Sequence, residues 1–246
     1  MEYRDLFEYN DIQVENKFRF SPSSFNNFYN NPKKWYEQQV LKQNTFKGNT
    51  QTVLGTIVHS RIGAYWLGIP IDEEVEVEYI SRYDDNPEVD CWKLKEQLDS
   101  IWDIVPDHIT QMKKPTEIEK EVVFEIPNTD YILAGSLDYI REDTLGDIKT
   151  TSTTPKKIKV GHRIQLYLYL LALRMNNEYL DLKNIEVLYI VKTKTPKIVT
   201  LVEPIDEEYL EYIKQEVKNM IKRLELIKQD ESMLDILFFN NQDSYL

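Results

Sequence analysis

The stretch Gly135-Ser-Leu-Asp138, followed by Gly146-Asp-Ile-Lys149 and then by Gln165-Leu-Tyr-Leu-Tyr169, determines how this chain is interpreted. The apolar run before Asp138 is typical of a strand that enters a turn near residues 141–143, and residues 145–150 are typical of the returning strand. Such a hairpin brings Asp138 and Asp147 close together, and alternation places Lys149 on the same strand face as Asp147. Two adjacent carboxylates raise each other's pKa unless a divalent cation lies between them. The pattern therefore predicts a metal site beside a lysine that can orient or deprotonate a water molecule.

Apolar periodicity and turn residues predict the elements around this stretch. Ser21 before Pro22 is a typical helix start, and this helix is expected to run until Pro32 interrupts it and a second helix begins near Lys33. Further helices are expected at 52–67, 92–109 and 162–175, and strands at 117–126, 131–140, 145–149 and 184–191. A last helix from Asp206 carries apolar residues in steps of three and four, which favours core packing over a partner-binding face. These residues are Leu210, Ile213, Val217, Met220, Leu224 and Ile227.

Composition indicates a globular chain with a sizeable core. The chain has 246 residues, of which 41% are hydrophobic. We expect no membrane span, because no run of eighteen apolar residues exists, and the charged amino terminus does not fit a signal peptide. The single cysteine, Cys91, excludes an internal disulfide and fits a reducing cytoplasm. We expect one domain over residues 1–246, with a variable, acidic and partly helical insertion at 71–116 and a carboxyl-terminal helix and tail at 206–246.

The net charge of −12 argues against a nucleic-acid partner unless basic residues are locally concentrated. The stretch from Lys149 to Arg163 contains no acidic residue, and it lies beside the predicted site. Its basic residues are Lys149, Lys156, Lys157, Lys159 and Arg163. We interpret this stretch as a DNA contact, whereas a solvated surface is the better interpretation of the other basic groups.

The motifs resemble a known family when they are taken in order. Asp138, Asp147-x-Lys149 and Gln165-xxx-Tyr169 are similar to the PD-(D/E)XK nuclease superfamily, and more narrowly to its RecB-type exonuclease branch. Upstream, Ser21–Tyr36 resembles the amino-terminal helix of these proteins, and Gly55-Thr-Ile-Val-His59 resembles their histidine motif. The resemblance implies an α/β fold with a restriction-endonuclease-like αβββαβ core. In such a fold, helices flank a central mixed sheet, and extra helices are expected at both ends.

The resemblance also implies a metal site. It assigns Mg²⁺ or Mn²⁺ to four ligands, namely His59, Asp138, Asp147 and the carbonyl of Ile148. Oxygen ligands suit these two ions better than zinc, and an imidazole ligand shifts the preference toward manganese. Either Glu119 or Glu121 could add a carboxylate from the preceding strand, although an exposed edge-strand face explains both residues equally well.

Catalytic and DNA-binding roles follow from the same resemblance. Lys149 is expected near the attacking water, where it would help to deprotonate the water or stabilise charge on the phosphate. Gln165 and Tyr169 are four residues apart and share a helix face turned toward the site. The glutamine is suited to a phosphate oxygen or a metal-bound water, and the tyrosine to a base or a phosphate. Ser21 and Ser23 resemble hydroxyls near the DNA path, and helix capping is an equally good interpretation of Ser21.

The expected activity is that of a metal-dependent deoxyribonuclease. By resemblance it is an exonuclease that acts on DNA ends or single strands in recombination, repair or phage DNA metabolism, alone or with a helicase or recombination protein in trans. A bacterial cytoplasm and a bacterial or phage genome are expected. No iron–sulfur cluster is expected, because Asn31 stands where the cluster-binding branch has a cysteine, and three further cysteines are lacking. The alternatives are a non-catalytic module that binds DNA ends or a protein, and an endonuclease of the restriction type, against which the amino-terminal motif weighs.

Overall fold

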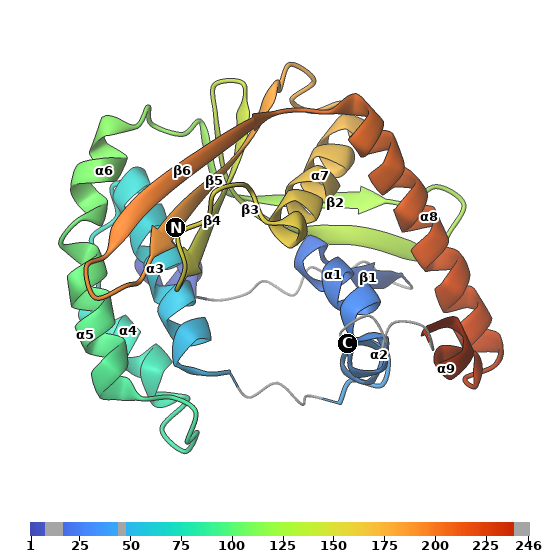
Figure 1. Ribbon diagram of the computed structural model, residues 1–246, viewed down its shortest axis with the longest axis horizontal. Coiled ribbons are helices and arrows are strands. Elements are labelled where there is room, and N and C mark those ends of the chain that lie inside the picture. The colour runs from blue at the N-terminus through green and yellow to red at the C-terminus, as the bar shows by residue number, and fades with distance from the viewer. Residues whose placement is uncertain (8–16, 44–47, 239–246) are drawn as a thin grey trace.

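Within residues 1–7, 17–43 and 48–238, which the computed structural model describes, helices flank both faces of a six-stranded mixed sheet (Figure 1). The strands are β1 (Phe18–Phe20), β2 (Glu117–Glu125), β3 (Tyr131–Arg141), β4 (Thr144–Thr151), β5 (Asn184–Val191) and β6 (Lys197–Pro204). The helices are η1 (Tyr3–Leu6), α1 (Pro22–Asn30), α2 (Pro32–Gln39), α3 (Thr50–Leu67), α4 (Glu73–Ser81), α5 (Cys91–Trp102), α6 (Val105–Gln111), α7 (Val160–Met175), α8 (Glu207–Gln229) and α9 (Met233–Phe238). The series α3, β2, β3, β4, α7, β5 confirms the predicted αβββαβ core.

Strand β3 exchanges one partner for another along a single edge. Its residues 131–133 pair in parallel with β1, and its residues 139–141 pair antiparallel with β4. On its other edge, β2 pairs with residues 132–140. In the part of the chain that the structure describes, residues 134–138 therefore have a strand partner on one side only. Asp138 lies at the end of this interval, where β3 and β4 diverge.

The two faces of the sheet carry two separate apolar clusters. One cluster packs α1, α2, α7 and α8 against the sheet, and the other packs α3, α4, α5 and α6 against the opposite face (Figure 1). Strand β5 serves both clusters, since Val187 and Tyr189 belong to the first and Leu188 and Ile190 to the second. A strand that is buried on both faces is expected to be almost continuously apolar, and β5 is. The predicted apolar face of the last helix is confirmed, because all six of its residues are buried.

Helix starts follow the predicted capping residues. Ser21 is the N-cap of α1, where its hydroxyl accepts a hydrogen bond from the Ser24 N–H at 3.2 Å. Asn31 ends α1 and caps α2, whose first residue is Pro32. The predicted interruption at Pro32 is therefore confirmed.

The predicted acidic loop after residue 71 is wrong in part. Residues Glu73–Ser81 form α4, which Asp72 caps through the N–H groups of Glu74 and Val75. Carboxylates are stabilised near a helix amino terminus by its dipole, so the dense acidic residues mark a helix start rather than a loop. The single helix predicted at 92–109 is in fact two, α5 and α6, because Pro106 fits only the first turn of a new helix.

Gly146 lies inside β4 and not in a turn. A Cβ atom at this position would be 2.1 Å from the ring of Tyr139, its partner on β3. The close approach of the ring requires glycine here and explains why the turn-like pair Gly146-Asp147 occurs within a strand. The structure reports no helix in the described ranges that could cross a membrane. The division of the chain into one domain stays a prediction.

A buried ion pair ties β3 to β5. Glu186 is fully buried, and its carboxylate accepts hydrogen bonds from Arg141 Nε at 3.0 Å and from the Tyr139 hydroxyl at 2.5 Å. Arg141 Nη2 also donates to Glu186, so the guanidinium pairs with both carboxylate oxygens.

We therefore expect Arg141→Met to lower the free energy of unfolding by about 3–5 kcal/mol, because it leaves the Glu186 charge buried and uncompensated. Urea denaturation measures this change. Lys113→Met is the matched control, since it removes the exposed pair between Lys113 and Glu142, which contributes about 0–1 kcal/mol. Equal effects of the two substitutions would contradict the importance of the buried pair.

Candidate active site

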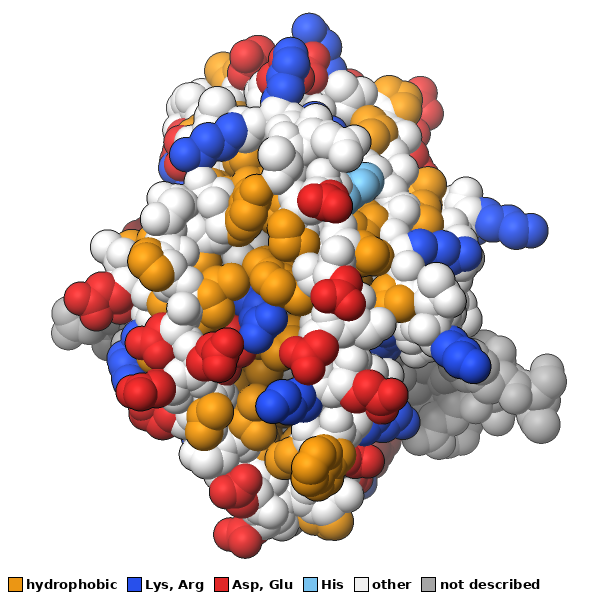
Figure 2. Space-filling view, turned by 90° about the vertical axis from the view of Figure 1, so that its left-hand side faces the viewer, with side chains coloured by type: hydrophobic (Ala, Val, Ile, Leu, Met, Phe, Trp, Pro, Cys, Tyr) orange, Lys and Arg blue, Asp and Glu red, His pale blue; other side chains and the backbone are white. Residues whose placement is uncertain are grey.

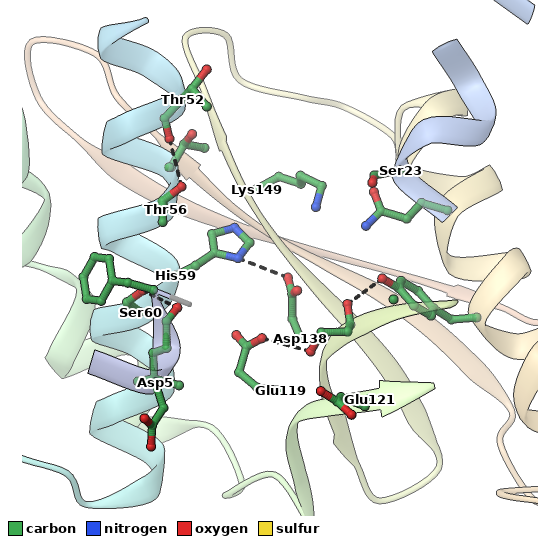
Figure 3. A pocket seen from close by; sticks show the side chains of 18 of the residues that line it. Asp5, Ser23, Thr52, Thr56, His59, Ser60, Glu119, Glu121, Asp138 and Lys149 are labelled. Atoms are coloured by element: carbon green, nitrogen blue, oxygen red, sulfur yellow. Dashed lines mark hydrogen bonds and ion pairs between the residues drawn. The ribbon is translucent and has the colours of Figure 1, made fainter. Parts of the chain in front are cut away.

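A cleft of about 680 Å³ lies along the open interval of β3 (Figure 3). Residues of α3 form one wall, α1 and α7 contribute to the other, and η1 lies at the edge near Asp5. The cleft contains six residues that the sequence predicted for the site, namely Ser23, His59, Asp138, Lys149, Gln165 and Tyr169. It also contains Arg19, which the sequence analysis missed because the short strand β1 was not recognised.

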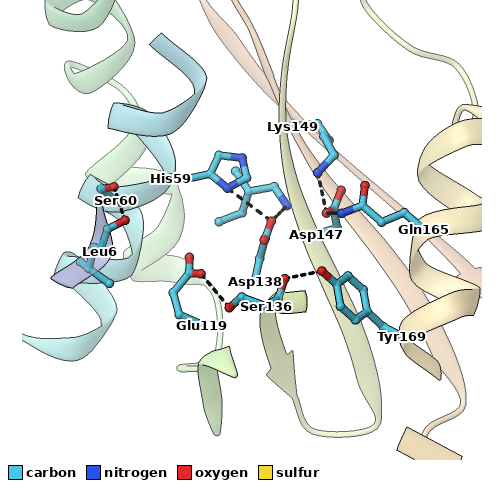
Figure 4. Close-up of polar contacts among 11 residues, drawn as sticks. Leu6, His59, Ser60, Glu119, Ser136, Asp138, Asp147, Lys149, Gln165 and Tyr169 are labelled. Carbon is cyan, nitrogen blue, oxygen red and sulfur yellow. Dashed lines mark hydrogen bonds and ion pairs between the residues drawn. The ribbon is translucent and has the colours of Figure 1, made fainter. Parts of the chain in front are cut away.

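Asp138 is held between β4 and α3. Its Oδ2 accepts the N–H of Ile148 at 2.5 Å and lies 3.5 Å from His59 Nδ1 (Figure 4). Burial raises the pKa of Asp138. Burial and the charge of Lys149 lower the pKa of His59 to about 4, so the imidazole is neutral at neutral pH. A neutral imidazole is the form that ligates metals.

Asp147 is held from the opposite side by β4 and α7. Its Oδ1 accepts hydrogen bonds from Lys149 Nζ at 2.6 Å and from Gln165 Nε2 at 3.2 Å. Its Oδ2 is buried and has no hydrogen-bond partner, although only 2% of the residue is exposed. Burial raises the pKa of Asp147 to about 6. Burial alone would lower the pKa of Lys149, but the carboxylates of Asp147 and Asp138 outweigh it and raise that pKa above its ordinary value.

Glu119 joins the site from β2. Its carboxylate, that of Asp138 and the imidazole of His59 each offer a ligand atom, and these atoms lie within 4.8 Å of one another. Ser136 Oγ donates to Glu119 Oε2 at 3.2 Å. Burial and the charge of Asp138 raise the pKa of Glu119 to about 8. The alternative of an exposed edge-strand face therefore does not apply to this residue.

The residues present fit a divalent cation. A buried carboxylate oxygen without a partner, as in Asp147, is costly unless a cation or a donor satisfies it. Carboxylates with one imidazole form the donor set that suits Mg²⁺ or Mn²⁺. The assignment of His59, Asp138, Asp147 and the Ile148 carbonyl as ligands remains a prediction.

Tyr169 serves the backbone of β3. Its hydroxyl donates to the carbonyl of Ser136 at 2.5 Å, inside the interval where β3 lacks a strand partner, and the residue is only 5% exposed. A Cβ at Gly135 would lie 2.8 Å from this hydroxyl, which explains the glycine. Contact of Tyr169 with a base or a phosphate stays a prediction.

The basic stretch predicted to contact DNA lies mostly outside the cleft lining. Lys156 and Lys157 are exposed, Lys159 Nζ donates to Thr151 Oγ1, and Arg163 pairs with Glu203 at 2.6 Å. Ser23 lines the cleft, and Ser21 caps α1. Figure 2 shows the face near α4, α5 and α6, where acidic and basic side chains are interspersed among apolar ones. DNA contact by the stretch remains a prediction.

Comparisons with known proteins agree with this geometry. A family model described as the PD-(D/E)XK nuclease superfamily matches residues 19–233. A crystal structure from Eubacterium rectale, described as a "putative exonuclease", is 17% identical, covers 89% of this chain and 88% of its own, and has a TM-score of 0.59. This likeness shows a shared restriction-endonuclease-like fold. No curated protein sequence matches the chain.

Two further solved structures are less similar. SSO0001 is 16% identical over 89% of this chain and 83% of its own, with a TM-score of 0.46. LHK-Exo in complex with dAMP is 13% identical over 70% of this chain and 91% of its own, with a TM-score of 0.34. Neither score is high enough to support an argument about this chain.

We expect Mn²⁺ to stabilise the folded protein, because it relieves the repulsion among the crowded carboxylates. At about 100 times its Kd, a ligand that binds only the folded state adds about 2.7 kcal/mol, which raises Tm by roughly 5–10 °C for a chain of this size. Differential scanning calorimetry in Mn²⁺ and in EDTA measures the shift. Asp138→Asn should remove most of it, whereas the exposed control Asp84→Asn should retain it. A full shift in Asp138→Asn would contradict metal binding at this site.

Proposed function

The chain belongs to the PD-(D/E)XK nuclease superfamily, and on that premise we propose that it is a metal-dependent deoxyribonuclease that hydrolyses DNA phosphodiester bonds at the β3 cleft. The observation that carries the proposal is the environment of Asp147. One oxygen is fixed by Lys149 and Gln165, and the other is buried without a partner beside Asp138. This is the arrangement expected of a carboxylate that is oriented for a cation.

The proposed ligands are Asp138, Asp147, the carbonyl of Ile148 and His59. A bound Mg²⁺ or Mn²⁺ would acidify a water and stabilise negative charge that develops on the phosphate. The protein supplies the orientation. The Ile148 N–H fixes Asp138, and Gln165 fixes Asp147, so neither carboxylate has to reorganise during the reaction.

Lys149 holds a proton in the proposed mechanism. The neighbouring carboxylates keep its pKa above the ordinary value, so it is an ammonium group at neutral pH. Of the two roles predicted for it, stabilisation of charge on the phosphate is therefore favoured over deprotonation of water. Its Nζ lies in the cleft and remains within hydrogen-bond distance of Asp147, so it can donate to a phosphate oxygen and to the carboxylate together.

Exonuclease action is the finer proposal. It rests on the resemblance to the RecB-type branch in the motifs from Ser21 to Tyr169. The relative from Eubacterium rectale bears the description of an exonuclease and shares the fold, which supports the same choice. A role in recombination, repair or phage DNA metabolism, and a helicase or recombination partner in trans, belong to the same proposal.

We expect the wild-type protein to degrade end-labelled linear DNA in Mg²⁺ or Mn²⁺ and to be inactive in EDTA. Asp147→Asn and Lys149→Met should each lower the rate by about 100-fold or more, because each removes a preoriented charge at the reacting phosphate. Lys183→Met, which changes an exposed lysine outside the cleft lining, is the control for a loss of positive charge.

Covalently closed circular DNA, single- and double-stranded, separates the remaining outcomes. An exonuclease leaves the circles intact, whereas cleavage of circles would make the protein an endonuclease. If the wild type cleaved nothing with either metal yet bound DNA as well as the variants do, the enzyme proposal would fail, and the non-catalytic binding module would replace it.

A further inference from the structure

Glu119 has a backbone conformation that its place in the fold does not explain. Its φ is +49°, and a non-glycine residue rarely adopts a positive φ. In the described part of the chain, the other non-glycine residues with positive φ lie in turns and loops, namely Lys42, Asn128, Glu142, Asn177 and Tyr179. Glu119 alone among them lies within a strand. Such outliers persist where the surrounding structure over-determines them, often at functional sites.

The register of the sheet places Glu119 across from Asp138. Ile118 pairs with Tyr139 and Lys120 with Leu137, so Glu119 and Asp138 occupy the intervening position. Both side chains point into the cleft, where His59 approaches from α3 (Figure 3). Like charges directly opposite on neighbouring strands destabilise a sheet. The pairing of two carboxylates here calls for a compensating positive charge.

Three donors from three elements converge at this point. His59 comes from α3, Glu119 from β2 and Asp138 from β3, with ligand atoms within 4.8 Å of one another. An ion with ligands at about 2.1 Å separates opposite ligands by about 4.2 Å, so small side-chain movements suffice to bind it. Ser136 fixes one oxygen of Glu119 and Tyr169 fixes the carbonyl of Ser136, so the carboxylate is held by a supported chain of hydrogen bonds.

Asp147 stands apart from this trio. Its carboxylate is held on the α7 side by Lys149 and Gln165, and Figure 4 shows Glu119 and Asp147 on either side of Asp138. Its Oδ2 is an unpartnered buried oxygen beside Asp138. The cleft thus presents two groups of donors that share one carboxylate.

We propose that His59, Glu119 and Asp138 form a second divalent-cation position, and that Asp138 bridges it to the position at Asp147. The inference rests on the proposed nuclease function and deepens it. Glu119 is a ligand that the sequence motifs do not assign. Imidazole with two carboxylates suits Mn²⁺. Two cation positions that share a carboxylate suit a phosphodiester, in which both the attacking and the leaving oxygen develop charge.

The test counts Mn²⁺ ions bound to the full-length protein without DNA, from the signal of free Mn²⁺ in electron paramagnetic resonance. We expect two ions per wild-type chain and one per chain of Glu119→Gln. The matched control is Glu121→Gln, which removes a charge two residues along the same strand and in the same cleft but outside the trio, and it should bind two. Calorimetry in EDTA confirms that each variant is folded.

His59→Gln supplies an independent check from another element, and it should also bind one ion. One ion in the wild type, or two ions in both Glu119→Gln and His59→Gln, would overturn the second position. If the ion counts follow the expectation but no DNA is cleaved, the second position stands and the nuclease proposal fails. If cleavage depends on Asp147 and Lys149 while Glu119→Gln keeps two ions, the nuclease proposal stands and this inference fails.

Discussion

The exchange of partners along one edge of β3 is the constraint on which the rest of the structure depends. Between the β1 pairing and the β4 pairing, residues 134–138 lack a strand partner on that edge, within the residues that the structure describes. Buried backbone groups must still be satisfied, and the Tyr169 hydroxyl does so at Ser136. A fully paired strand would leave no room for a substrate. The interval opens the sheet at the point where Asp138 emerges.

The site departs from the rules that the remainder of the molecule follows. Elsewhere, buried charges are matched, as in the pair of Arg141 with Glu186 and the pair of Arg61 with Glu76, whose guanidinium donates at 2.8 and 2.7 Å. In the cleft, three carboxylates share one lysine, and one oxygen of Asp147 has no partner. A fold that satisfies its polar groups everywhere except in one cleft has concentrated its electrostatic cost where a ligand can offset it.

The sequence predicted those parts that depend on local patterns. The strands around Asp138 and Asp147, the helix with Gln165 and the buried face of α8 follow from periodicity, and the family follows from motif order. The sequence did not predict β1 or α4, because a three-residue strand has little pattern and an acidic helix start resembles a loop. Nor could it assign Glu119, whose position depends on cross-strand register and a positive φ. Lys156 and Lys157 are close to Lys149 in sequence but lie outside the cleft lining, since nearness along the chain does not fix side-chain direction.

An acidic chain that acts on a polyanion requires a physical explanation, and the cleft provides one. Its lining carries the carboxylates of Asp5, Glu119, Glu121 and Asp138 but only two fixed cations, Arg19 and Lys149. Proteins that merely hold DNA neutralise phosphates with lysine and arginine. A cleft with excess carboxylates instead repels phosphate until divalent cations occupy it, so substrate binding becomes coupled to metal binding. A non-catalytic module would gain nothing from this arrangement, and the charge of the cleft therefore favours the enzyme over its alternative.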